Sequence, residues 1–280
     1  MKIATFNING IKARINALTE WIDQSNPDVI LLQEIKSRDE VFPKEHFEDK
    51  GYNVQTHGQK GFNGVAILSK YPLEDVTRGL PGDDSDEQSR WIEATISLQD
   101  VSLRVCSLYA PNGNPTPGPK YDYKLQWMER MLLHAKNLLT YEMPIIIAGD
   151  YNIIPQEIDA ATPTQWTDDA LFLLESRTAF RKILNLGYTD SYRLLDKSHS
   201  KYTFWDYQAG SWNKNNGIRI DHFLLSPKCI DLLLDTGIDS EIRGHERPSD
   251  HVPIWIKISE KNTLETVSYT HLTLPTTPYV

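Results

Sequence analysis

The polar side chains of this sequence that could do chemistry stand where short apolar runs begin or end. Asp150, for example, follows the run Pro-Ile-Ile-Ile-Ala-Gly, and Asn152 comes two positions later, on the same side of an extended chain. Other carboxylate, amide, phenol and imidazole groups occupy comparable places, and the full set is Asn7, Glu34, Tyr109, Asp150, Asn152, Asp221, Asp250 and His251. Because residues at strand ends of α/β sheets can converge on a shared crevice, we interpret this set as one candidate site.

The candidate set is rich in hard oxygen ligands, which suit Mg²⁺, or Mn²⁺ as a substitute, rather than zinc. Carboxylates gathered in one crevice repel one another, so a divalent cation is a natural reason to assemble them. His245 and His251 are six positions apart and have no sulfur partners, so they do not have zinc spacing. Each residue alone also fits an ordinary structural explanation, such as a turn-forming asparagine, and only the joint arrangement favours chemistry.

The elements that must position these groups are short buried strands separated by amphipathic helices. Strands are predicted at 3–6, 28–32, 64–68, 91–98, 103–109, 144–149, 218–225 and 252–258. Helical spacing predicts helices from Ile15 until Asn26-Pro27, from Tyr121 to Leu139 and from Leu171 to Leu184, whereas the Pro/Gly-rich segment 111–119 is a loop. No linker separates two compositions, so we expect one α/β domain, over residues 1–260, with mixed sheets and covering helices.

Composition excludes several other classes of protein. The 280 residues are 40% hydrophobic and 24% charged, which is typical of a globular chain and not of a disordered or collagen-like one. The net charge is −9, so a polyanion would have to bind at a local site rather than over a generally basic surface. Two cysteines, Cys106 and Cys229, are too few for a disulfide framework.

Neither a secretory signal nor a membrane-spanning apolar run is visible, so we expect a cytoplasmic protein without a membrane partner. Residues 261–280 are expected to form an unstructured tail. Its last part, VSYTHLTLPTTPYV at 267–280, carries no Asp, Glu, Lys or Arg and has no helical period. We interpret that part either as an extension foreign to the natural protein or as a genuine flexible tail.

Seven segments of the chain resemble, in order, the motifs of the exonuclease III family of abasic-site endonucleases. They are KIATFNINGI at 2–11, DVILLQEIK at 28–36, GVAI at 64–67, YAPNG at 109–113, GDYN at 149–152, RIDH at 219–222 and SDHVP at 249–253. The resemblance implies a four-layer α/β sandwich of two packed mixed β-sheets flanked by helices. It also implies an enzyme that cleaves DNA phosphodiester bonds by in-line water attack, as a 3′-to-5′ exonuclease on duplex DNA and an endonuclease at abasic sites.

The resemblance also implies roles for the candidate residues. The metal would be held mainly by Glu34, and the full set of implied ligands is Asn7, Glu34, Asp150, Asn152, Asp250 and His251. Asp150 would handle the proton of the attacking water or of the leaving oxygen, and Asn152 would orient the phosphate or the water. Tyr109 would hold a phosphate oxygen, while His251, oriented by Asp221, would contact the scissile phosphate. The implied partner is duplex DNA with abasic sites or 3′ ends, bound by a monomer.

Contact with DNA requires a local basic surface on this acidic chain. From Arg193 to Arg219 the sequence has five basic and two acidic residues, a local charge of +3, with aromatic residues interleaved. This pattern favours a backbone groove with stacking surfaces, although aromatics packed in a core and a rim of solvated lysines would produce the same sequence. The predicted substrate-binding residues are Phe204, Trp205, Trp212, Ile218, Arg219 and Ile220.

Within the family resemblance, Phe204, Ile218 and Ile220 would line the pocket for an abasic deoxyribose. Ile218 stands where some family members carry tryptophan, so the pocket is expected to differ in shape. Plain core packing is the competing interpretation of all three residues.

Two other functions remain open from the sequence. A phospholipid or inositol-phosphate phosphodiesterase on the same scaffold would keep the metal and His251, but would be expected to lack the aromatic segment 202–212. A non-catalytic nucleic-acid-binding protein is disfavoured by the intact Glu34, Asp150 and His251.

Overall fold

Two six-stranded sheets form the centre of the molecule in the computed structural model, which describes residues 1–261. The first sheet has the order β11-β12-β1-β2-β4-β3 and the second the order β5-β6-β7-β8-β10-β9. The strands of the first sheet are β1 (Lys2–Asn7), β2 (Val29–Gln33), β3 (Asn53–His57), β4 (Val65–Ser69), β11 (Leu233–Ile238) and β12 (Ile254–Ile258). The strands of the second are β5 (Glu74–Arg78), β6 (Trp91–Ser97), β7 (Ser102–Tyr109), β8 (Ile145–Asp150), β9 (Thr189–Asp190) and β10 (Asp221–Leu225).

Each sheet is mixed, with one parallel pair among antiparallel ones. β1 pairs in parallel with β2, and β7 pairs in parallel with β8. The central strands read as nearly continuous Val/Ile/Leu runs because both of their faces are buried. The prediction of a four-layer sandwich of two mixed sheets is confirmed.

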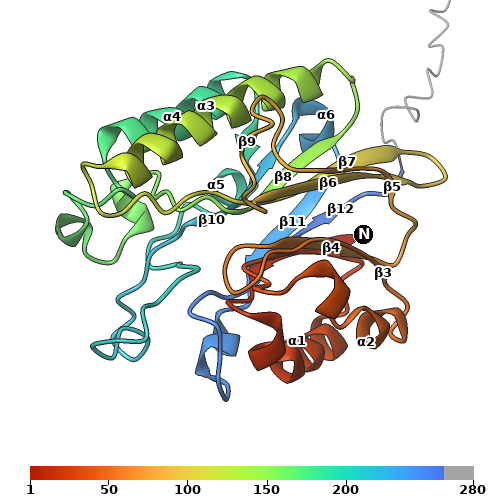
Figure 1. Cartoon of the computed structure of the whole chain (residues 1–280), viewed down its shortest axis with the longest axis horizontal. Helices are drawn as coiled ribbons and strands as arrows, with labels where there is room; N and C mark the ends of the chain where they lie inside the picture. The colour runs from red at the N-terminus through yellow and green to blue at the C-terminus, as the bar shows by residue number, and fades with distance from the viewer. Residues whose placement is uncertain (262–280) are drawn as a thin grey trace, which may run out of the picture.

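Helices cover the outer face of each sheet, so the layers are helix, sheet, sheet, helix (Figure 1). The first sheet is covered by α1 (Ile11–Ser25) and α2 (Lys44–Glu48), and the second by α3 (Pro119–Leu139) and α4 (Leu174–Asn185). Short helices α5 (Ser191–Leu195) and α6 (Pro227–Ile230) flank β10. The central core is the apolar layer between the sheets, where for example Ile3 and Leu31 pack in one cluster with Val105 and Ile146.

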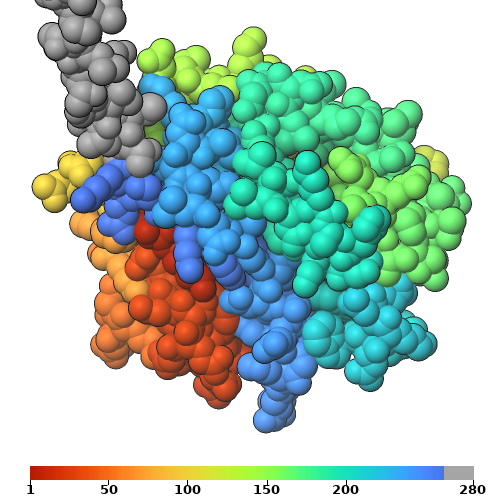
Figure 2. Space-filling view, turned by 180° about the vertical axis from the view of Figure 1, so that it is seen from behind, coloured from red at the N-terminus to blue at the C-terminus, as the bar shows by residue number. Residues whose placement is uncertain are grey.

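The N- and C-terminal parts of the described chain meet in one sheet. β1 pairs antiparallel with β12, with Ile3 opposite Ile256. The space-filling view accordingly shows the blue C-terminal segment lying against the red N-terminal one (Figure 2). Residues 262–280, and with them the interpretation of 267–280 as a tail or foreign extension, lie outside the described residues.

Five elements differ from the expectation in an informative way. β10 begins at Asp221, because residues 218–220 form only isolated bridges, such as Ile218 with Phe204. The polar, half-exposed strands β3, β5 and β11 lack the apolar run that predicted the central strands. In α3, which matches the helix predicted from Tyr121 to Leu139, the charged Lys124 is buried while the apolar Leu125 is only partly so.

Candidate active site

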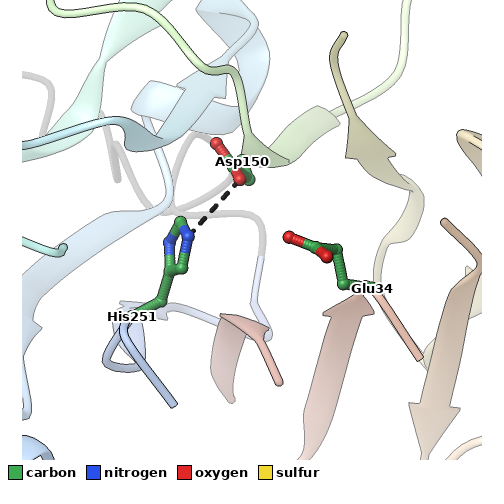
Figure 3. Close-up of side chains that lie close together, drawn as sticks. All are labelled: Glu34, Asp150 and His251. Carbon is green, nitrogen blue, oxygen red and sulfur yellow. Dashed lines mark ion pairs between the residues drawn. The ribbon is translucent and has the colours of Figure 1, made fainter. Parts of the chain in front are cut away.

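The site lies at one end of the sandwich, where strands of both sheets end together. Asn7 ends β1, Glu34 follows β2, and Asp150 ends β8. Asp221 begins the antiparallel neighbour β10, directly opposite Asp150, and His251 precedes β12. Glu34, Asp150 and His251 point toward one another in the close-up (Figure 3). The predicted convergence of strand ends therefore brings together groups that are far apart in the sequence.

Asn7 joins the two sheets at the centre of the site. Its carboxamide nitrogen donates to Glu34 Oε1 at 2.9 Å and to Asp150 Oδ2, also at 2.9 Å. Below it, Gln33 of the first sheet donates to the hydroxyl of Ser107 in the second at 3.0 Å. Asn7, Gln33 and Ser107 are all fully buried, and buried polar groups with satisfied hydrogen bonds fix side chains in single positions.

The segment after β8 turns back on itself instead of continuing in extended form. Asn152 has a φ of 49°, and its backbone N–H donates to Asp150 Oδ1 at 2.8 Å. The expectation that Asp150 and Asn152 share one side of an extended chain is therefore wrong, because this local turn replaces the strand geometry. The turn still places Asn152 at the site, where its Nδ2 donates to the carbonyl of Ala110 at 2.9 Å.

His251 lies between two aspartates. Its Nδ1 is 2.8 Å from Asp221 Oδ2 and its Nε2 is 3.6 Å from Asp150 Oδ2. Burial by itself would lower the pKa of the imidazole, but the charges of Asp221 and Asp150 raise it to about 10. Burial, reinforced by the charge of Asp221, raises the pKa of Asp150 to about 7, although the charge of His251 opposes that rise. The arrangement stabilises a protonated imidazole facing a carboxyl group that can exchange protons near neutral pH.

Glu34 and Asp250 are held by two residues to which the sequence analysis gave no role. Lys36 Nζ lies 2.9 Å from Glu34 Oε2 and donates to Asn9 Oδ1 at 2.5 Å. Asn9 in turn donates to Asp250 Oδ1 at 3.0 Å. Burial raises the pKa of Glu34, but the hydrogen bond from Asn7 and the charge of Lys36 outweigh it and lower the pKa overall. Both Asn9 and Lys36 fall within the family motifs, and the position of Lys36 two residues after Glu34 is the available sequence signal.

Tyr109 ends β7 directly opposite Asp150. Burial, together with the charges of Glu34 and Asp150, raises the pKa of its phenol well above the usual value, so it stays protonated. The guanidinium of Arg90 lies over the ring at 4.8 Å and donates to the Tyr109 carbonyl at 3.2 Å. Tyr109 is therefore a fixed hydrogen-bond donor at the edge of the site.

The segment 193–219 supplies less basic surface than its composition suggests. Arg219 is buried, and its guanidinium binds Asp159 and Asp190 at 2.8 Å each. Arg193 binds Asp159 at 2.6 Å. Two of the five cations are thus paired with aspartates, and the full burial of Arg219 contradicts the prediction that it is a substrate-binding residue. Arg219 instead anchors the segment that leads into Asp221.

The tryptophans of this segment are also largely internal. Trp205 is 2% exposed and donates to Asn215 Oδ1 at 3.1 Å. Trp212 is partly buried, and its ring meets the Trp205 ring edge-on at 4.9 Å between centroids. These two rings pack with Tyr202 and Val252, so the core-packing alternative applies to Trp205. The prediction that Trp205 contacts substrate is contradicted, because its ring does not reach the surface.

Phe204 is the aromatic residue of the segment that lies against His251. It is partly buried, and its ring centroid lies 5.0 Å from that of His251. Ile218 and Ile220 are buried and pack behind it in one apolar cluster, which contradicts the prediction that these two side chains contact substrate directly. The expected pocket therefore has Phe204 as its accessible wall, supported by the two isoleucines.

Three donor atoms in the site could share one metal ion. One ligand atom each from Glu34, Asp150 and His251 lie within 4.8 Å of one another. Asp250 lies beside this cluster through its bond to Asn9, and Asn7 bridges the two carboxylates. Two carboxylates and one imidazole thus form a possible metal site.

The four-layer sandwich and this acidic, histidine-containing site define the class of enzymes that hydrolyse phosphoesters. More specifically, the chain belongs to the Endonuclease/Exonuclease/phosphatase family, whose model matches residues 4–251. Exodeoxyribonuclease III of Haemophilus influenzae is 38% identical over 266 residues, covering 91% of this chain and 98% of that protein.

Solved structures give the same result. An AP endonuclease from Archaeoglobus fulgidus superposes with a TM-score of 0.87 at 35% identity, covering 92% of this chain and 99% of the other. The 3′ phosphatase NExo from Neisseria, bound to a product DNA hairpin, superposes with a TM-score of 0.88 at 34% identity and the same coverages. The predicted resemblance to exonuclease III and the predicted nuclease class are confirmed. Within residues 1–261, no helix has the length and apolar character needed to span a membrane.

Proposed function

We propose that the protein is a Mg²⁺-dependent DNA repair nuclease that cleaves duplex DNA at abasic sites and removes nucleotides from 3′ ends. The observation that carries the proposal is the buried Asp150–His251–Asp221 arrangement beside Glu34. Support comes from the relatives, which include an exodeoxyribonuclease III and an AP endonuclease that this chain matches over most of its length.

Glu34 is the residue best suited to hold a divalent cation, with Asn7 and Asp250 close by. His251 offers the third donor atom of this cluster, but we assign the imidazole to the phosphate, because Asp221 and Asp150 favour its protonated form. When bound, the cation would neutralise phosphate charge and stabilise the leaving oxygen. Mn²⁺ has similar ligand preferences and is expected to substitute for Mg²⁺.

Asp150 is the group that we assign to proton transfer. Its raised pKa, about 7, allows the carboxylate to accept a proton from an attacking water and to return it at neutral pH. The Asn152 N–H and Asn7 hold one oxygen each of this carboxylate, which fixes the direction from which a proton arrives. The Asn152 carboxamide, beside it, orients the water or the phosphate.

His251 and Tyr109 are positioned to bind phosphate oxygens. The imidazole, kept protonated by Asp221, offers positive charge, and the phenol offers a neutral hydrogen-bond donor. Such fixed donors stabilise the negative charge that develops during in-line attack on phosphorus. A protein with a net charge of −9 can then meet DNA through this local site.

Incubation of the purified protein with Mg²⁺ and separate abasic duplex, blunt duplex and phospholipid or inositol-phosphate substrates tests this proposal. We expect incision of the abasic duplex and shortening from 3′ ends, with no hydrolysis of the lipid or inositol phosphates. Both DNA reactions should stop in EDTA and resume when Mg²⁺ is restored. Preferential hydrolysis of a lipid or inositol phosphate, or activity that persists after exhaustive chelation, would contradict the proposal.

A further inference from the structure

A lysine is buried at the base of the active-site loops. Lys124 lies on the inner face of α3 and is 0% exposed. Burying an ammonium group is costly unless its charge and donors are matched, and an apolar side chain would be the ordinary occupant of this helix face. Its neighbours on the same face, such as Trp127 and Met131, are indeed apolar. The presence of a lysine here therefore requires a specific partner.

Its partners are backbone carbonyls of three separate loops. Nζ donates to the carbonyl of Asn152 at 2.6 Å, of Asn112 at 3.0 Å and of Ala170 at 3.2 Å. An ammonium has three N–H donors, so all three are used. A neutral amine has only two, so the three contacts favour the charged form, whereas burial lowers the pKa of Lys124 to about 7. The lysine thus ties the loop after β7, the loop after β8 and the segment before α4 to one point.

The surrounding chain is shaped to admit this side chain. Gly113 has a φ of +92°, and a Cβ added there would lie 2.7 Å from Lys124 Cδ. The loop after β7 therefore passes closer to the lysine stem than a residue with a side chain would allow. This close approach brings the Asn112 carbonyl within reach of Nζ.

Asn152 is the link between Lys124 and the catalytic carboxylate. Its backbone carbonyl accepts from Lys124, while its backbone N–H donates to Asp150 Oδ1 at 2.8 Å. Its side-chain oxygen accepts from Asn112 Nδ2 at 3.1 Å, and Asn112 is itself held by Lys124. The left-handed backbone of Asn152, with φ at 49°, is a conformation open to asparagine, and these hydrogen bonds hold it in place.

We propose that Lys124 is a positioning residue for catalysis, which holds the turn at Asn152 so that its N–H and carboxamide stay aligned with Asp150. Lys124 acts through the Asn152 and Asn112 backbones and does not itself touch the substrate. The inference rests on the proposed nuclease function for its effect on turnover. Its structural part, the fixed turn at Asn152, stands independently of that function.

Replacement of Lys124 by methionine tests the inference, because Lys124→Met keeps the length of the stem and removes every donor. Lys136→Met is the matched control, since Lys136 is an exposed lysine on the same helix. Turnover and KM are measured on an abasic duplex with saturating Mg²⁺, well below the melting temperature of each variant. Amide hydrogen exchange at Asn152 is measured on the same samples without DNA.

We expect kcat of Lys124→Met to fall by about 100-fold, the effect of a small misplacement of catalytic groups, with KM changed by less than about threefold. The Asn152 amide should exchange at least about tenfold faster than in the wild type, since its local hydrogen bond opens more often. Lys136→Met should match the wild type in both measurements.

A folded Lys124→Met variant with kcat within about threefold of the wild type would overturn the proposal. If that variant does not fold, Lys124→Gln, which keeps two donors on a shorter stem, should show a partial loss of kcat with unchanged KM; normal kcat in it would equally overturn the proposal. Failure of the wild type to cleave DNA would instead refute the nuclease function. Unchanged exchange at Asn152 in Lys124→Met would refute the positioning role in either case.

Discussion

The imidazole of His251 binds Asp221 across the two sheets of the sandwich, with Nδ1 2.8 Å from Oδ2. Asp221 begins β10 in the second sheet, whereas His251 precedes β12 in the first. Among the described residues, the other oxygen of Asp221 is buried without a hydrogen-bond partner. The imidazole is therefore the hydrogen-bond partner of this carboxylate, and its Nε2 faces Asp150.

Replacing Asp221 by asparagine should therefore impair catalysis through His251. The Asp221→Asn variant loses the charge that keeps the imidazole protonated and directed at the site. We expect kcat on duplex DNA to fall by about 10²–10³-fold, the loss typical of one stabilising group in a transition state. Asp231→Asn, a change at an exposed aspartate, is the control and should leave kcat unchanged. Normal turnover in Asp221→Asn would remove His251 from the proposed chemistry.

Glu34 and Asp150 should separate into a metal-binding and a proton-transferring group. Glu34→Ala is expected to raise the Mg²⁺ concentration needed for half-maximal activity. Asp150→Asn keeps the shape and should mainly reduce kcat, by about 10²–10⁴-fold. Titration of each variant with Mg²⁺ at saturating DNA distinguishes the two effects. Near-normal turnover in Asp150→Asn would show that the proton is transferred elsewhere.

The buried Glu93 predicts how stability depends on pH away from the active site. Glu93 accepts from Arg104 at 2.8 Å and bonds with His134 at 2.9 Å. Burial raises its pKa, but these two partners outweigh that effect and lower the pKa from 4.5 to about 2. Because the folded pKa lies below the unfolded one, this group stabilises the fold fully above pH 4.5, and the contribution is lost as pH falls toward 2.

The size of this contribution follows from the shift in pKa and is roughly 3 kcal/mol. Glu93→Gln should lower the free energy of unfolding at pH 7 and flatten its decline between pH 4.5 and about 2. Glu129→Gln, at an exposed position on α3, is the control. The free energy of unfolding is measured for both proteins by thermal unfolding across this pH range. If it falls with pH equally steeply in Glu93→Gln and in the wild type, the role of Glu93 is contradicted.

Phe204 should determine specificity rather than stability alone. Its ring stands beside His251 with Ile218 and Ile220 behind it, where an abasic sugar would fit against an apolar wall. Phe204→Ala should reduce cleavage of abasic duplex and weaken discrimination against intact duplex. Cleavage of both substrates and the melting temperature are measured for this variant and for Leu195→Ala, a control at an exposed position. If the ratio of abasic to intact duplex cleavage is unchanged while stability falls by about 3–5 kcal/mol, Phe204 is a core residue and not a specificity residue.

The sequence predicted the central strands and the site residues at their ends because both follow from local patterns. Asn7, Glu34 and Asp150 each stand at the end of a buried apolar run, and the pairing of those runs brings them together. Asn152 lies at the site but not by the geometry expected, since its left-handed turn, a conformation that asparagine favours more than most residues do, replaces the extended chain.

What could not be predicted depends on contacts between distant segments. Arg219 looks like a DNA-binding residue by composition, but it pairs with Asp159 and Asp190, which lie 60 and 29 positions away. Lys124 looks like a solvated lysine of an amphipathic helix, and only the folded loops provide its three carbonyl partners. Such residues are assigned once the packing is known, because charge alone does not distinguish a surface cation from an internal one.

The most direct test of the account is the fate of the water oxygen during incision of an abasic duplex. The reaction is run in ¹⁸O-labelled water with Mg²⁺, and the cleaved ends are analysed by mass spectrometry, with Asp150→Asn as the inactive comparison. In-line hydrolysis predicts one ¹⁸O atom in the phosphate at the new end, and a greatly reduced yield of this product from the variant. Strand cleavage that leaves the phosphate unlabelled, or labelled product formed equally well by Asp150→Asn, would contradict the account.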